Sequence, residues 1–109
     1  MLRKLIALFA AVVVFSTASV AFDGYVEVTN DTGYDIYFLY ISPGKAKTWE
    51  EDLLGEDFLK HGQTVRVTVS GAKSGIFDIR AQDEDGDTYT LWDVDIAARD
   101  VTFTLSDLD

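Results

Sequence analysis

Short runs of Val, Ile, Thr and aromatic residues, separated by Gly, Asn and Asp, recur about every ten residues along most of this chain. Each run is long enough for one strand, and each break supplies turn residues, which is typical of an all-β sandwich or barrel. The predicted strands are residues 25–29, 34–42, 64–70, 76–82, 88–97 and 101–105. We therefore expect an all-β fold, a small antiparallel, immunoglobulin-like β-sandwich of about six strands.

A second pattern occupies the amino terminus. Arg3 and Lys4 precede an apolar run from Leu5 to Phe15, and small residues follow up to Ala21. This order is that of a secretory signal peptide, and the run is shorter than the about 20 residues that a membrane-spanning helix needs. We expect a signal peptide at residues 1–21, cleaved after Ala21, and one β-sandwich domain at residues 22–109, periplasmic or secreted. Retention as a signal anchor is the alternative.

Composition narrows the partners of the exported domain. The chain has 19 acidic and 9 basic residues, and two of the basic residues belong to the predicted leader. A strongly acidic body repels nucleic acid and anionic membrane surfaces, so neither is expected as a partner after cleavage. There is no cysteine, which excludes disulfides and lipid attachment through a thiol. Stability must come from packing, largely of aromatic side chains.

The run at residues 34–42 is apolar on both faces. Alternation places Ile36, Phe38 and Tyr40 on one face, and Tyr37, Leu39 and Ile41 on the other. A sandwich strand normally keeps one face in water, so the outer face is either covered or used for binding. The candidate binding residues are Tyr25, Tyr37, Leu39 and Trp49.

The alternative cover for this strand is the segment 49–59. Thr48 and Glu51 have the spacing of a helix capping box, and Gly55 suits the end of a helix. We expect one short helical segment here, with Trp49 and nearby leucines packed on the sandwich. In that arrangement the segment covers Tyr25, Tyr37 and Leu39.

Acidic residues cluster between two predicted strands. Asp83, Asp85 and Asp87 surround Gly86, and Asp78 and Asp93 lie on the strands on either side. Ca²⁺ prefers six to eight oxygen ligands at a flexible turn, so these five aspartates are candidate metal ligands. The Glu that completes an EF-hand is missing, because Val94 stands at the twelfth position counted from Asp83.

The plainer interpretation of this cluster is the tip of a hairpin. Asp85-Gly86 suits a two-residue type I′ turn, which would set Phe77 opposite Val94. The same register places Ile79 opposite Trp92, Ala81 opposite Thr90 and Asp78 opposite Asp93. No cofactor is required, and Ca²⁺ is the alternative.

Catalytic signals are absent from the sequence. His61 is the single histidine, next to a turn glycine, and no serine lies in a Gly-x-Ser-x-Gly elbow. We therefore predict that the protein is not an enzyme, and an exported hydrolase is the third choice.

Three motifs resemble those of a family of small exported bacterial β-sandwich proteins. They are Tyr-x-Ser-Pro at Tyr40 to Pro43, Trp-x-x-Asp-x-Leu-Gly at Trp49 to Gly55, and the late Asp-x-Asp-Gly turn that ends at Gly86. The resemblance extends from about Val26 to Asp95. It implies an exported β-sandwich, and since the family has no settled activity, it assigns no catalytic residue.

The function predicted from the sequence is an exported, non-catalytic β-sandwich that binds another protein or a cell-surface component. The alternative is a Ca²⁺-responsive acidic domain that uses the turn at residues 83–87.

Overall fold

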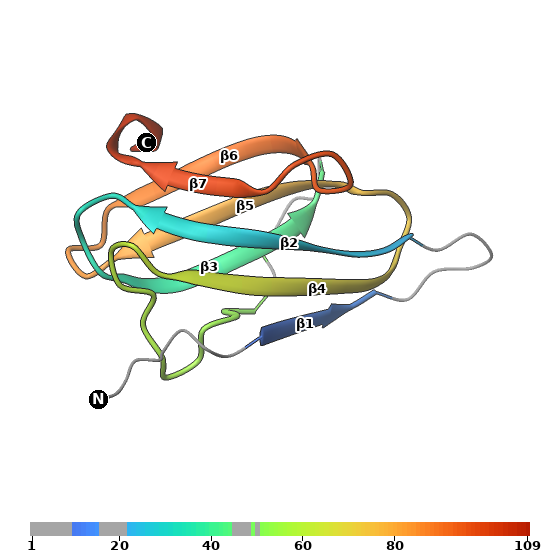
Figure 1. The fold of residues 1–109 in the computed structure, drawn as a ribbon, viewed down its shortest axis with the longest axis horizontal. Coiled ribbons are helices and arrows are strands. Elements are labelled where there is room, and N and C mark those ends of the chain that lie inside the picture. Colours follow the sequence, from blue (N-terminus) through green and yellow to red (C-terminus); the bar gives the residue numbers. More distant parts are fainter. Residues whose placement is uncertain (1–9, 16–21, 45–48, 50) are drawn as a thin grey trace.

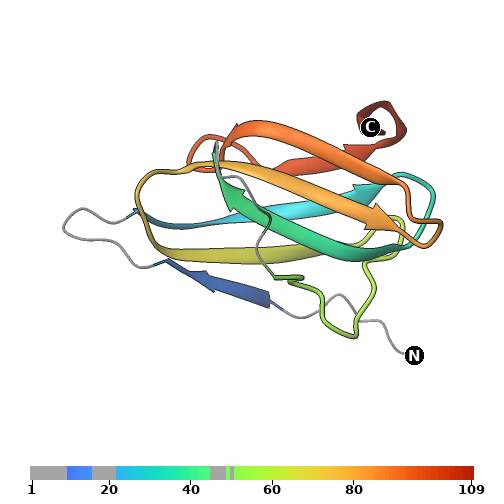
Figure 2. The same cartoon turned by 180° about the vertical axis from the view of Figure 1, so that it is seen from behind.

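The computed structural model describes residues 10–15, 22–44, 49 and 51–109. Within them seven strands form two stacked sheets, which Figures 1 and 2 show from opposite sides. The strands are β1 (Ala10–Val14), β2 (Phe22–Asp31), β3 (Ile36–Pro43), β4 (Thr64–Ala72), β5 (Ile76–Asp83), β6 (Thr88–Asp95) and β7 (Val101–Thr104). Sheet I has the order β1-β4-β2-β7, and sheet II has the order β3-β5-β6. The predicted small β-sandwich is confirmed.

The six predicted strands correspond to β2 through β7. The predicted antiparallel pairing holds for β2–β4, β3–β5 and β5–β6, whereas β1–β4 and β2–β7 are parallel. The inner faces carry the core, in which Val26, Val67 and Phe77 are among the fully buried side chains. Side chains from both sheets therefore meet in one apolar layer, as in other sandwiches.

Strand β3 does not alternate as predicted. Ile36, Leu39 and Ile41 are buried, while Phe38 is exposed and Tyr40 is half-buried. The pairing of β3 with β5 shifts between Ile36 and Phe38, and this irregularity moves Ile36 to the same side as Leu39. The predicted partition of β3 side chains is therefore wrong at Ile36.

The predicted helix at residues 49–59 is wrong, because the described part of this segment forms bends and a turn. The N–H of Leu53 donates to the carbonyl oxygen of Leu39 at 2.8 Å. The Asp52 carboxylate accepts the N–H of Leu39 at 2.9 Å and the N–H of Leu54 at 3.0 Å. The segment thus satisfies the open edge of β3, and Asp52, which lies within the predicted helical segment, binds that edge instead.

The segment still acts as the predicted cover. Leu54 and Leu59 are buried, and Leu59 pairs with Ile36 through hydrogen bonds of 2.9 Å in both directions. We call residues 52–59 the β3 cover. Its position was predicted, and its backbone conformation was not.

The β5–β6 hairpin has a longer turn than predicted. The N–H of Asp83 donates to the carbonyl oxygen of Asp87 at 2.9 Å, and the N–H of Gly86 donates to the carbonyl oxygen of Asp83 at 3.0 Å. Gly86 has a φ of 86°, which a glycine adopts at little cost. These features belong to a three-residue hairpin loop, and the two-residue type I′ turn is wrong.

The hairpin register changes accordingly. Phe77 lies opposite Val94 as predicted, but Ile79 lies opposite Leu91 and Ala81 opposite Tyr89. The register shifts between Phe77 and Ile79, and on the facing strand Asp93 has a φ of 52°. This bulge turns the Trp92 side chain to the solvent.

Strand β1 lies within the predicted leader. It pairs in parallel with β4, from Ala10 opposite Arg66 to Val14 opposite Ser70. Its Val-rich stretch favours an extended strand as well as an apolar leader, since both need the same composition. Residues 1–9 and 16–21, including the predicted cleavage site, lie outside the described residues. No helix in the described part of the chain is long and apolar enough to cross a membrane.

Candidate functional site

The outer surface of sheet II carries a cluster of aromatic side chains. Phe38 and Tyr40 lie side by side on β3 with parallel rings 6.4 Å apart. The ring of Trp92 on β6 lies 6.1 Å from the ring of Trp49. We call Phe38, Tyr40, Trp49, Trp92 and the Arg80 among them the aromatic face.

Arg80 organises this face from the central strand of sheet II. Its guanidinium carbon lies 4.7 Å from the centre of the Trp49 ring, a cation–π distance. Its Nε donates to the Thr90 hydroxyl at 2.9 Å, and Tyr40 lies opposite it on β3. A terminal nitrogen of Arg80 also lies 4.0 Å from the Asp109 carboxylate. The guanidinium is therefore fixed in direction beside the aromatic rings.

The aromatic face exposes apolar area to water. Trp92 is 61% exposed. Tyr and Trp are enriched at binding surfaces, because they offer a large, stiff and amphipathic area at a low entropic cost. Burial, and then the negative charge of Asp52, raises the pKa of Tyr40, so its hydroxyl stays protonated and able to donate at neutral pH. The face thus combines apolar contact with oriented polar groups.

The predicted binding residues do not form one surface. Leu39 is 1% exposed in the core, so its prediction as a surface residue is wrong. Tyr25 is exposed on sheet I, with the Arg66 guanidinium carbon 4.0 Å from its ring centre. Tyr37 is half-buried and stacks on Phe58 at 4.4 Å. Of the predicted set, only Trp49 belongs to the aromatic face.

The residues that the sequence missed are Phe38, Tyr40 and Trp92. Alternation places Phe38 and Tyr40 on the face opposite Leu39 and Ile41, but it does not say which face is outward. The bulge in β6, which simple alternation does not contain, turns Trp92 outward. One available signal is the polar Arg80 within an apolar run, because a charged residue in a sandwich strand marks the outer face and its cross-strand neighbours share that face.

The predicted acidic turn brings three carboxylates together. Oxygens of Asp83, Asp85 and Asp87 lie within 4.8 Å of one another. Asp83 is buried, and its Oδ1 accepts the N–H groups of Asp85 at 2.9 Å and Asp87 at 3.0 Å. Its Oδ2 accepts the Tyr89 hydroxyl proton at 2.7 Å, and burial followed by this hydrogen bond raises the pKa of Tyr89. Asp83 therefore closes the hairpin with its own carboxylate.

Asp78 and Asp93 lie apart from this turn. The Oδ1 of Asp78 accepts the N–H of Asp93 at 2.8 Å. This contact holds the bulge of β6, where Asp93 has its positive φ. Among the described residues, the two do not join the candidate metal group of Asp83, Asp85 and Asp87.

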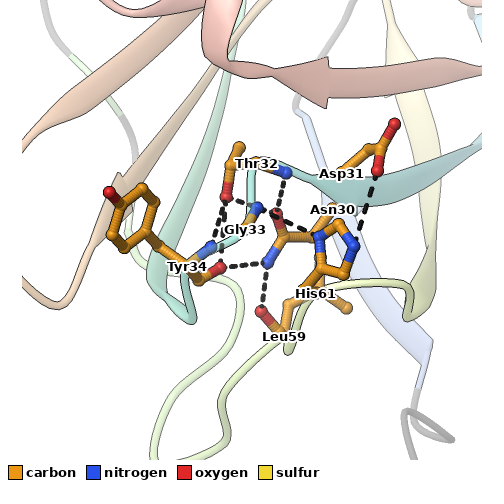
Figure 3. Close-up of polar contacts among 7 residues, drawn as sticks. All are labelled: Asn30, Asp31, Thr32, Gly33, Tyr34, Leu59 and His61. Atoms are coloured by element: carbon orange, nitrogen blue, oxygen red, sulfur yellow. Dashed lines mark hydrogen bonds and ion pairs between the residues drawn. The ribbon is translucent and has the colours of Figure 1, made fainter.

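His61 belongs to a structural network around Asn30 (Figure 3). The Asn30 side chain is buried, and its Nδ2 donates to the carbonyl oxygens of Tyr34 at 2.7 Å and Leu59 at 2.8 Å. Its Oδ1 accepts from the N–H of Thr32 at 3.0 Å and from its hydroxyl at 2.7 Å. Nδ1 of His61 accepts the N–H of Gly33 at 3.0 Å. The network fastens the β2–β3 turn to the end of the β3 cover.

A cleft of about 450 Å³ lies along β2 and the loop before β7. Its carboxylates already serve the fold. Glu27 binds Arg66 at 3.0 Å, and Oδ1 of Asp100 accepts the N–H of Glu27 at 3.0 Å. Asp23 accepts the N–H of Gly71 at 2.9 Å. These contacts favour a structural role for the acids of this cleft.

No protein-family model matches this sequence, and no curated protein or solved structure matches it either.

Proposed function

We propose that this chain is an exported, non-catalytic β-sandwich that binds another protein or a component of the cell surface through the aromatic face. The observation that carries the proposal is the exposure of Trp92 beside Trp49, with Arg80 held over the Trp49 ring. Aromatic residues and arginine are the residue types that dominate binding energy at interfaces. The proposal of export rests on the three-part pattern of residues 1–21.

The experiment compares capture by three versions of the processed protein. Immobilised wild type, Trp92→Asp and Thr102→Asp are exposed to solubilised envelope and culture medium of the producing organism. Thr102 is the matched control, because it is exposed on sheet I, away from the aromatic face. Circular dichroism and thermal melting verify that each variant is folded.

The expected result is a partner retained by wild type and by Thr102→Asp, and lost with Trp92→Asp. A partner that survives Trp92→Asp contradicts the assignment of the aromatic face. The same partner is expected to stay bound when a chelator is added, since this surface needs no metal.

The second candidate function is a Ca²⁺-responsive domain. The closeness of the Asp83, Asp85 and Asp87 carboxylates favours it, and the use of both Asp83 oxygens by the hairpin opposes it. A thermal-shift series with Ca²⁺, Mg²⁺ and chelator decides between them. A melting temperature that rises with Ca²⁺ in wild type and not in Asp85→Asn supports the metal function, and an unchanged one supports the hairpin role.

A further inference from the structure

Three edges of the sandwich have a cover, and one of these covers lies inside the predicted leader. The β3 cover satisfies β3, and the C-terminal residues reach β6 through the pairing of Leu108 with Tyr89 and a 2.9 Å hydrogen bond from Asp109 to Thr88. The edge of β4 is covered by β1 alone among the described residues. Cleavage after Ala21 removes β1 and opens the edge of β4.

We propose that the β4 edge of the exported protein binds an extended apolar segment of a partner protein, which adds as a strand parallel to β4. This inference rests on the proposed export and cleavage. Addition of a strand to an open sheet edge gives affinity through backbone hydrogen bonds and specificity through alternate side chains. The pairing of β1 with β4 has both the backbone hydrogen bonds and the alternation of inward and outward side chains.

The backbone of β4 offers regularly spaced groups to an incoming strand. The carbonyl oxygen of Ser70 accepts the N–H of Phe15 at 2.8 Å. Because backbone groups of alternate residues point to the same side of a strand, Thr68 also presents its N–H and C=O to this edge. Left open, such an edge is a template for pairing with another chain.

The side chains of β1 show what the edge selects. Ala11 is buried, and Val13 and Phe15 pack against the core, whereas Val12 and Val14 are 62% and 74% exposed. The inward positions therefore take a small, a β-branched and an aromatic residue in that order. The outward positions have no such requirement.

The site that holds the Phe15 ring is formed by residues of the predicted domain itself. The ring of Phe15 lies 5.7 Å from the ring of Phe77 and lines a cleft of about 330 Å³ with Pro43 and Ile76. A side chain at Gly71 would overlap the carbonyl oxygen of Phe15. The glycine therefore leaves room for the backbone of the added strand.

A strand from a partner fits this site better than a second copy of the chain. Among the described residues, a second copy offers two open edges, that of β4 and the outer edge of β7. The inward side chains of both strands, Val65, Val67 and Val69 on β4 and Val101 and Phe103 on β7, are buried in their own core. Pairing of the β4 edge with either of them would therefore leave the places of Val13 and Phe15 unfilled.

The test uses the processed protein and two synthetic peptides based on residues 10–15. The first carries the leader sequence with Val12→Lys and Val14→Lys, which add solubility at the exposed positions. The second has the same two changes and Val13→Asp, which places a charge on the inward face. Mass spectrometry first establishes that the exported protein begins at Phe22. Thermal melting and fluorescence anisotropy of labelled peptides give the stabilisation and the affinity.

We expect the first peptide to raise the melting temperature saturably, by at least about 4 °C. The second peptide should bind at least about tenfold more weakly, because burying an unpaired carboxylate is costly. Both arms use one unchanged protein, so failure to fold cannot imitate the result.

Three outcomes would overturn the proposal. If neither peptide binds, or both bind equally, the edge does not select an apolar strand while export still stands. If light scattering shows a dimer that neither peptide dissociates, a second copy occupies the edge. If the exported protein retains residues 10–15, the proposed cleavage fails, and the edge is permanently covered by its own strand.

Discussion

The edges of β3 and β4 are both covered, but by different means. The β3 cover uses the Asp52 carboxylate, paired backbone groups and the buried Leu54 and Leu59. The cover of β4 uses backbone pairing and one buried side chain, Ala11, with Val13 and Phe15 partly buried. The β3 cover is therefore part of the core of the domain, whereas β1 packs at the edge of that core.

We infer that the sandwich is closed for stability at the β3 edge and, once β1 is removed, open to exchange at the β4 edge. A cover that contributes core residues cannot leave without exposing apolar area. A cover that contributes few of them leaves at a small cost, and another strand of similar pattern can replace it.

The largest effect is expected for Leu59→Ala in the β3 cover. Leu59 is fully buried, so its truncation should lower the free energy of unfolding by about 2–5 kcal/mol. Urea denaturation of the processed protein measures it. The control is Phe58→Ala, which truncates an exposed neighbour that stacks on Tyr37 and should cost only about 0.5–1.5 kcal/mol. Equal costs for the two variants would contradict a core role for the β3 cover.

Asp52→Ala is expected to have the next largest effect. It removes the acceptor of the N–H groups of Leu39 and Leu54, and each group then lacks its partner. The expected loss is about 1–3 kcal/mol in the same urea experiment. Asp57→Ala removes an equal charge from an exposed site of the segment and should change stability by about 0.5 kcal/mol or less. A similar loss in both variants would assign the effect to charge alone.

In the full-length chain, Val13→Ala should cost only about 1 kcal/mol or less, because Val13 is partly buried at the margin of the core. Val12→Ala, at an exposed position, is the control and should have no measurable effect. Comparison of denaturation midpoints checks both. A cost for Val13→Ala as large as that for Leu59→Ala would show that β1 is an integral strand, and the contrast between the edges would fail.

The smallest effect concerns the titration of Tyr40. Burial and the charge of Asp52 raise the pKa of Tyr40 above the usual value of about 10. The stability that protonated Tyr40 contributes is therefore present below about pH 10, and it is lost as the pH rises through the pKa of Tyr40 in the folded protein. Asp52→Asn removes the charge and should let Tyr40 ionise at a lower pH. Ultraviolet absorbance of tyrosinate follows the titration, and an unchanged curve would contradict the contribution of the Asp52 charge to the raised pKa of Tyr40.

Sequence alternation was sufficient to predict six strands and the sandwich, because a half-buried strand must place apolar residues at every second position. It was insufficient for the register of β5 with β6. The three-residue loop and the bulge at Asp93 both depend on side-chain acceptors. Asp83 binds the N–H groups of Asp85 and Asp87 within the loop, and Asp78 binds the N–H of Asp93, which only the pairing of the two strands brings near.

Two other sequence patterns suit more than one structure. Asp52 has the sequence setting of a helix-capping residue, but a carboxylate can equally accept N–H groups from an open strand edge. The Val-rich part of the leader satisfies the composition of a signal peptide and that of a strand. The aromatic face could be found only in part, because alternation does not say which face of β3 is outward, and Trp92 owes its outward position to the bulge in β6.

Amide hydrogen exchange of the processed protein tests the exchangeable β4 edge most directly. The amides of Thr68 and Ser70 should exchange rapidly in the free protein and slowly once the first peptide is bound. The amides of Val67 and Val69, which pair with β2, should be protected in both states. Protection of Thr68 and Ser70 before any peptide is added, or their continued rapid exchange at saturating peptide, would contradict the account.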